Sequence, residues 1–133
     1  MKKLISILSI LIITACSNSD NDNTTPQSSF VGNWKGTYIG TGGTSNNGDV
    51  GTWDINVVAN GNVTGVAHSN TYNENYVVTG SVNTTGQINL TVGTSSAGGN
   101  FIGNMNTNGS ASGTWSNNIP TPPYSGTWTG TKQ

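Results

Sequence analysis

The sequence predicts an all-β domain over residues 30–133, in which eight antiparallel strands follow one another up and down and close into a small barrel. Apolar and polar residues alternate with a period of two through most of this region, as in strands with one buried face. No window keeps a helical period, and the abundance of Gly, Asn, Thr and Val disfavours helix. Short breaks rich in Gly, Asn and Ser let each run pair antiparallel with the next.

The alternating runs define the predicted strands, which in chain order are Phe30–Gly40, Val50–Ala59, Asn62–Ser69, Asn75–Asn83, Gln87–Thr94, Asn100–Thr107, Ser110–Ser116 and Tyr124–Lys132. Turn chemistry marks the breaks between them. Asn60-Gly61 and Asn108-Gly109 favour two-residue primed turns, in which both central residues take a positive φ. The connections over residues 41–49 and 117–123 are longer.

Alternation places most apolar side chains on one face of the predicted sheet and Thr, Asn, Ser and Asp on the other. The apolar face collects Trp34, Tyr38, Trp53, Ile55, Val57, Val63, Ala67, Tyr76, Val78, Val82, Ile88, Leu90, Val92, Phe101, Met105, Ala111, Trp115, Tyr124 and Trp128. The apolar exceptions on the polar face are Val58, Val66, Val77 and Ile102.

An apolar face must be covered, either by a second sheet or by curling until the last strand pairs with the first. We expect the barrel, because glycines within the strands relieve crowding in a strongly coiled sheet. The interior of an eight-stranded barrel is filled by side chains or holds one small ligand. A membrane-spanning barrel is disfavoured, since its outer face would be apolar rather than rich in Thr and Asn.

The N-terminal residues predict export and anchoring, with a lipoprotein signal peptide over 1–15 and a lipidated Cys with a disordered tether over 16–29. A short basic start precedes the apolar run Leu4–Ile13, which is too short to span a bilayer. Ile13-Thr14-Ala15-Cys16 then resembles the lipobox of bacterial lipoproteins. The alternative is an ordinary signal peptide with a chance Cys.

The lipobox resemblance implies diacylglycerol and further acyl chains, such as palmitate, on Cys16, and several chains anchor a protein firmly. It places the protein in the cell envelope as an outer-membrane lipoprotein. Ser17–Ser29 is polar and reads as a flexible tether. Asp20 and Asp22 resemble surface-export signals of some bacterial lipoproteins, with a merely solvated linker as the alternative.

The first predicted strand carries a second resemblance. Phe30-Val-Gly-Asn-Trp-Lys35 is similar to the first-strand signature of calycins, the lipocalin, fatty-acid-binding and avidin-like barrels. The resemblance implies that Trp34 is a structural plug at the closed end of a barrel. Lipocalins place an Arg from a late strand over this Trp, and the present chain has no Arg. The Gly-x-Trp pattern itself recurs at Gly51–Trp53, Gly113–Trp115 and Gly126–Trp128.

Strand direction then predicts a ring of aromatic side chains at the open end. The candidate ligand-binding residues are Tyr38, Trp53, Tyr76, Trp115 and Tyr124, with His68 and Tyr72 nearby. Aromatic rings at a rim can stack on the apolar face of a sugar or on a flat ligand. The alternative is that these rings are simply the core of the barrel.

Catalytic and metal-dependent chemistry is not predicted. His68 is the single His and falls on the polar face, and a transition-metal site needs three or four ligands. Asp49, Asp54 and Glu74 are too scattered to indicate a calcium loop. We expect no catalytic residues, no cofactor and no nucleic acid, since Lys35 and Lys132 cannot neutralise a phosphate track.

The sequence therefore favours a monomeric, lipid-anchored barrel that binds a small apolar molecule or a glycan at its open end. The second reading is a non-enzymatic structural or interaction lipoprotein with a filled core, which contacts another envelope protein or a host protein.

Overall fold

A computed structural model describes residues 29–42, 48–94, 98–119 and 122–133. The predicted signal peptide over 1–15 and residues 16–28 of the predicted tether over 16–29, Cys16 included, lie outside the described residues. Within the described ranges there is no helix with the length and apolar character needed to cross a membrane.

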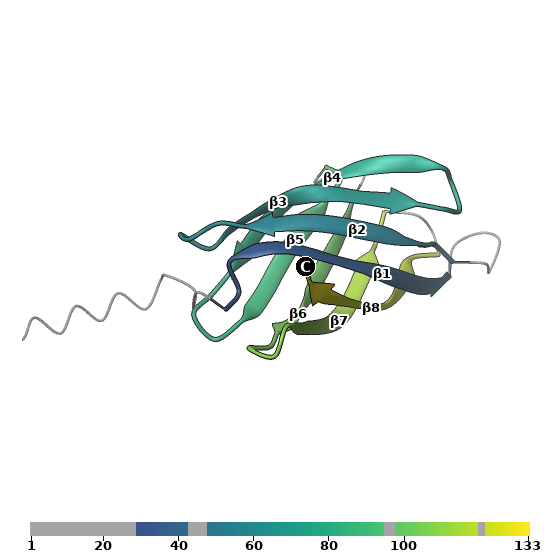
Figure 1. Cartoon of the computed structure of the whole chain (residues 1–133). Helices are drawn as coiled ribbons and strands as arrows, with labels where there is room; N and C mark the ends of the chain where they lie inside the picture. Colours follow the sequence, from purple (N-terminus) through teal and green to yellow (C-terminus); the bar gives the residue numbers. More distant parts are fainter. Residues whose placement is uncertain (1–28, 43–47, 95–97, 120–121) are drawn as a thin grey trace, which may run out of the picture.

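The prediction of a closed eight-stranded barrel is confirmed (Figure 1). Its strands are β1 Gly32–Gly42, β2 Val50–Val57, β3 Asn62–Ser69, β4 Glu74–Val82, β5 Gln87–Val92, β6 Gly99–Met105, β7 Ser110–Asn117 and β8 Tyr124–Lys132. Each strand pairs antiparallel with the next. The sheet closes because β8 also pairs with β1, from Trp34 opposite Lys132 to Gly42 opposite Tyr124.

The predicted faces are also confirmed. The side chains assigned to the apolar face are buried, apart from the half-buried Tyr76 and Tyr124. Val58, Val66, Val77 and Ile102 are exposed on the outside. Phe30, which the sequence placed at the start of a strand, instead lies in a turn before β1 and is buried.

The tight turns differ from the prediction. Positive φ occurs at Gly61 and Gly109 but not at Asn60 or Asn108, so these are not two-residue primed turns. The Gly61 N–H donates to the Val58 carbonyl at 2.9 Å, and the Val58 N–H donates to Asn62 at 3.1 Å. This is a three-residue loop ending in a left-handed glycine.

Side-chain hydrogen bonds explain why asparagine occupies these turns. Asn60 Oδ1 accepts from the backbone N–H of Asn62, and Asn108 Oδ1 accepts from that of Ser110, both at 3.0 Å. Asparagine commonly stabilises turns through such bonds to the backbone two residues on. The sequence signal was therefore right about the position of the turns and wrong about their type.

Inward-facing glycines receive the large aromatic rings of neighbouring strands. The register sets Trp53 opposite Gly36, and a Cβ on Gly36 would lie 2.4 Å from the Trp53 ring. On the other side of β1, a Cβ on Gly130 would lie 2.2 Å from the same ring. A side chain at either position would collide with the indole, so these glycines create the space that the indole fills.

The pairing of β7 with β8 sets two copies of the Gly-x-Trp pattern opposite each other. Gly113 lies opposite Trp128, and Trp115 lies opposite Gly126. A Cβ on Gly113 would lie 2.7 Å from the Trp128 ring, whereas the Trp115 ring lies against Gly40 of β1, where a Cβ would come within 2.2 Å of it.

Trp34 lies at the end of the barrel that holds the tight turns. It is 0% exposed, and its Nε1 donates to the Phe30 carbonyl at 2.8 Å. Lys132 pairs with Trp34 in the register and therefore shares its face of the sheet. The Lys132 Nζ donates to the Ser29 carbonyl at 2.9 Å. This hydrogen bond connects the end of β8 to the residues that precede β1.

We expect Trp34→Ala to lower the free energy of unfolding by about 3–5 kcal/mol, because it removes a fully buried indole and its hydrogen bond. Urea unfolding followed by circular dichroism measures this change. Ile39→Ala is the control, since Ile39 is 62% exposed on the outer wall. Equal stability losses in the two variants would contradict the role of Trp34 as a plug.

Candidate binding site at the open end

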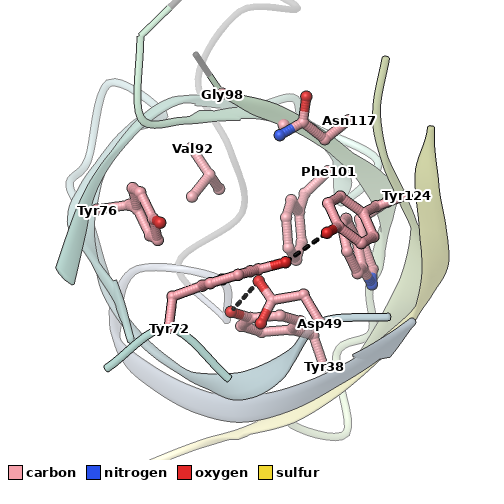
Figure 2. A pocket seen from close by; sticks show the side chains of 11 residues that line it. Tyr38, Asp49, Tyr72, Tyr76, Val92, Gly98, Phe101, Asn117 and Tyr124 are labelled. Carbon is pink, nitrogen blue, oxygen red and sulfur yellow. Dashed lines mark hydrogen bonds between the residues drawn. The ribbon is translucent and has the colours of Figure 1, made fainter. Parts of the chain in front are cut away.

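A hollow of about 80 Å³ opens at the end of the barrel away from Trp34 (Figure 2). Its lining comes from the ends of strands and from the connections between them. The residues are Tyr38, Asp49, Tyr72, Tyr76, Val92, Gly98, Gly99, Phe101, Trp115, Asn117 and Tyr124.

All four tyrosines of the chain line this hollow. Tyr38 comes from β1, Tyr76 from β4 and Tyr124 from β8, while Tyr72 lies in the connection between β3 and β4. A tyrosine suits a site with one apolar and one wet side, because its ring packs while its hydroxyl stays hydrated or hydrogen-bonded. The mouth is thus chemically distinct from the rest of the interior.

Asp49 supplies a carboxylate to the hollow. Its Oδ2 accepts a hydrogen bond from the Tyr38 hydroxyl at 3.0 Å, and its Oδ1 accepts one from the Ser69 hydroxyl at 2.6 Å. Its backbone carbonyl also accepts from the Gly40 N–H at 2.8 Å. These three bonds hold the carboxylate in one place within the half-buried mouth.

Ser69 connects Asp49 to the neighbouring loop. Its side chain is fully buried, and its Oγ also accepts from the Tyr72 backbone N–H at 3.1 Å. Asn73, which follows Tyr72, has a φ of 53°, a left-handed conformation that Asn tolerates better than most residues. The loop is thereby turned so that Tyr72 lies across the opening (Figure 2).

The tyrosine hydroxyls are linked at the rim. Tyr72 and Tyr124 share a hydrogen bond between their hydroxyls, and their ring centroids are 6.4 Å apart. Tyr76 donates to Glu74 Oε2 at 2.7 Å. Figure 2 shows Tyr76 and Tyr124 on opposite sides of the opening, with Tyr72 between them.

These surroundings raise the pKa of the Tyr38, Tyr72 and Tyr76 phenols. Burial, with a contribution from the Asp49 charge, raises the pKa of Tyr38 well above its usual value. Burial and the hydrogen bond to Glu74 raise the pKa of Tyr76 to about 12. The hydrogen bond to Tyr124 is the main cause that raises the pKa of Tyr72 to about 12.

The floor of the hollow is aromatic. Phe101 and Trp115 stack with centroids 5.6 Å apart, and the Tyr38 ring meets each of them edge to face. Below them, the middle of the barrel is almost filled, with an apolar gap of about 10 Å³. A gap of this size has room for about one water molecule.

The structure brings together four of the five predicted site residues, namely Tyr38, Tyr76, Trp115 and Tyr124. Trp53 is the exception and does not line the hollow. It borders the apolar gap and meets Trp128 edge to face at 5.7 Å. The register explains the difference, because Trp53 pairs with Gly36, which lies closer to the closed end than Tyr38 does.

Sequence reasoning missed three polar residues of the mouth, Asp49, Ser69 and Asn117. Asp49 immediately precedes β2 at the open end, but it was considered only as a calcium ligand. Ser69 shares the inward face of Ala67 by alternation, and that signal could have found it. His68 faces outward as predicted, where its Nδ1 lies 2.9 Å from Asn75 Oδ1.

The described residues contain no group of three His, Cys, Asp or Glu side chains that could hold a metal ion. The mouth instead offers aromatic faces, hydroxyls, an amide and a carboxylate. This set of groups can bind a ligand through stacking and hydrogen bonds.

Comparisons with protein-family models, curated proteins and solved structures found no match to this chain. The description of the site therefore depends on the geometry of its own residues.

We expect the free energy of unfolding to fall as the pH rises from about 10 to about 12. The ordinary pKa of tyrosine is 10.0, whereas Tyr72 and Tyr76 titrate at about 12 in the folded protein. The folded state then binds more protons than the unfolded state in this window, so stability is fully present below pH 10 and is lost through pH 12.

Urea unfolding at a series of alkaline pH values, with tyrosinate absorbance recorded in parallel, measures this dependence. Tyr76→Phe should make the decline shallower, because it removes one of the displaced titrations. An unchanged free energy of unfolding across the window would contradict the pKa values.

Proposed function

We propose that the protein is a binding module of the cell envelope, whose open end holds a compact ring or headgroup such as the edge of a saccharide. The gathering of all four tyrosines around one hollow carries this proposal. Their rings offer faces for the apolar side of a ligand, while Asp49 and Asn117 offer polar groups for its edge.

The size of the hollow limits the ligand. A dry cavity of about 150 Å³ is known to enclose benzene, whereas the hollow measures about 80 Å³. The gap beneath it is about 10 Å³. A fatty acid therefore has no channel to enter, and of the two ligand classes expected from the sequence a glycan is favoured over an apolar molecule.

The nearly filled middle of the barrel favours a second candidate function, an interaction lipoprotein that contacts another envelope or host protein. Cross-linking on intact cells distinguishes the two. A stable protein partner that survives saturation with small ligands would support the interaction role.

Titration with neutral and amino saccharides, indole and palmitate tests the binding function. We expect ring compounds to shift the NMR signals of residues around the hollow and palmitate to leave them unchanged. Tyr124→Ala should weaken the binding of saccharides and indole about tenfold, because it removes an aromatic ring on which these ligands can stack. Ile39→Ala on the outer wall is the matched control. If no ring compound shifts these signals, the proposed binding function is contradicted.

We further propose that acylation of Cys16 anchors the module to the membrane. The lipobox-like residues Ile13–Cys16 support this proposal. In cells, Cys16→Ser should abolish incorporation of labelled palmitate and release the protein from the membrane fraction, whereas Ser17→Ala should change neither. Retention of label in Cys16→Ser would contradict the anchor.

A further inference from the structure

The hollow at the open end contains negative charge and no positive side chain among the described residues. Asp49 lines it, and Glu74 accepts a hydrogen bond from Tyr76, which also lines it. Residues 43–47, 95–97 and 120–121 contain no Lys, Arg or His. The electrostatic field at the mouth therefore favours a cation.

The basic side chains among the described residues lie away from the hollow and contact other groups. Lys35 pairs with Asp54 at 2.8 Å on the outer wall. Lys132 donates to the Ser29 carbonyl at the closed end, and His68 contacts Asn75 on the outside. Among the described residues, the half-buried Asp49 carboxylate therefore has no cationic side chain beside it.

Asp49 retains capacity to bind such a cation. An ionised carboxylate offers about four acceptor positions. Among the described residues, Tyr38 donates to one oxygen and Ser69 donates to the other. Each oxygen keeps a lone pair for a further donor, and a protonated amine carries N–H donors without acceptors. A quaternary ammonium has no N–H and would be attracted to the carboxylate by charge alone.

The aromatic rings complete the surroundings that a cation prefers. Tyr72, Tyr76 and Tyr124 are arranged around the opening above Asp49 (Figure 2). Ring faces attract ammonium groups through their quadrupoles, and quaternary ammonium ligands are commonly held in cages of aromatic rings. A hollow of about 80 Å³ also suits a compact headgroup better than a whole ring system.

We propose that the open end binds the ammonium group of a small organic cation, with Asp49 as its counter-ion and the tyrosine rings around it. This inference rests on the proposed binding function and names the chemistry of its ligand. The ammonium is a protonated amine, as on an amino sugar, or a quaternary ammonium, and the two arms of the experiment distinguish these sources.

The experiment compares matched ligands that differ in charge. Glucosamine is tested against N-acetylglucosamine, and choline against its neutral isostere 3,3-dimethyl-1-butanol, by NMR and tryptophan emission. We expect the cation of at least one pair to bind about tenfold more tightly than its neutral partner, as a charge-assisted hydrogen bond from a protonated amine or a cation–π contact with a quaternary ammonium allows. The affinity of that cation should fall as ionic strength rises from about 0.01 M to about 1 M.

Asp49→Asn should reduce the preference for the cation about tenfold, while Asp54→Asn should leave it unchanged. Asp54 is a matched control because its side chain is 55% exposed on the outer wall. Near-ultraviolet circular dichroism checks that Asp49→Asn is folded. If Asp49→Asn fails to fold, the cation preference is tested in the unaltered protein by the comparison of ligands and by the salt dependence.

Equal binding of cations and neutral partners would overturn this inference and leave the proposed binding function standing. Absence of binding by every ligand in the saccharide and ammonium panels would overturn both. A cation preference that survives Asp49→Asn and disappears in Asp54→Asn would place the site on the outer wall and would also overturn the inference.

Discussion

The fit of aromatic rings onto inward-facing glycines is the constraint on which the barrel depends. A strongly coiled sheet of eight strands encloses little volume, so its interior cannot hold large side chains at every inward position. Glycine removes a side chain where a neighbouring strand supplies an indole. Gly36 and Gly130 accommodate Trp53, while Gly113 and Gly103 accommodate Trp128, with Cβ-to-ring separations too short for any other residue. Close packing is thereby reached with few large residues.

This packing separates the barrel into regions of different chemistry. Phe30 and Trp34 close one end, and Trp53 and Trp128 fill the apolar middle with aliphatic side chains. The tyrosines lie at the other end, where their hydroxyls can reach Asp49, Glu74 or one another. Because the middle is filled, the interior space among the described residues is a shallow mouth rather than a deep cavity. The closed eight-stranded meander is compatible with a lipocalin-like fold, while the described residues leave no channel for a long apolar chain.

Sequence patterns predicted the fold more fully than the site. Period-two alternation identified the strands and the inward face, because successive side chains of a strand point to opposite faces and their polarity shows which face is buried. Turn type was harder to predict, since Asn60 and Asn108 favour a turn both by tolerating positive φ and by accepting backbone hydrogen bonds. Trp53 was placed at the mouth, but the register with Gly36 moves it deeper. Asp49 was missed because its partners Tyr38 and Ser69 lie far from it in the sequence.

By itself, the sequence determined the all-β class, the positions of the turns and the division between an apolar interior and a hydroxyl-rich exterior. These properties depend on local alternation and on residues adjacent along the chain. Tertiary structure alone decided which glycine receives which indole, how much of the interior stays empty and which polar groups meet Asp49. Those outcomes depend on the register between strands and on barrel closure, which bring Tyr38 of β1 and Ser69 of β3 to Asp49 and set the Trp53 ring against Gly130 of β8.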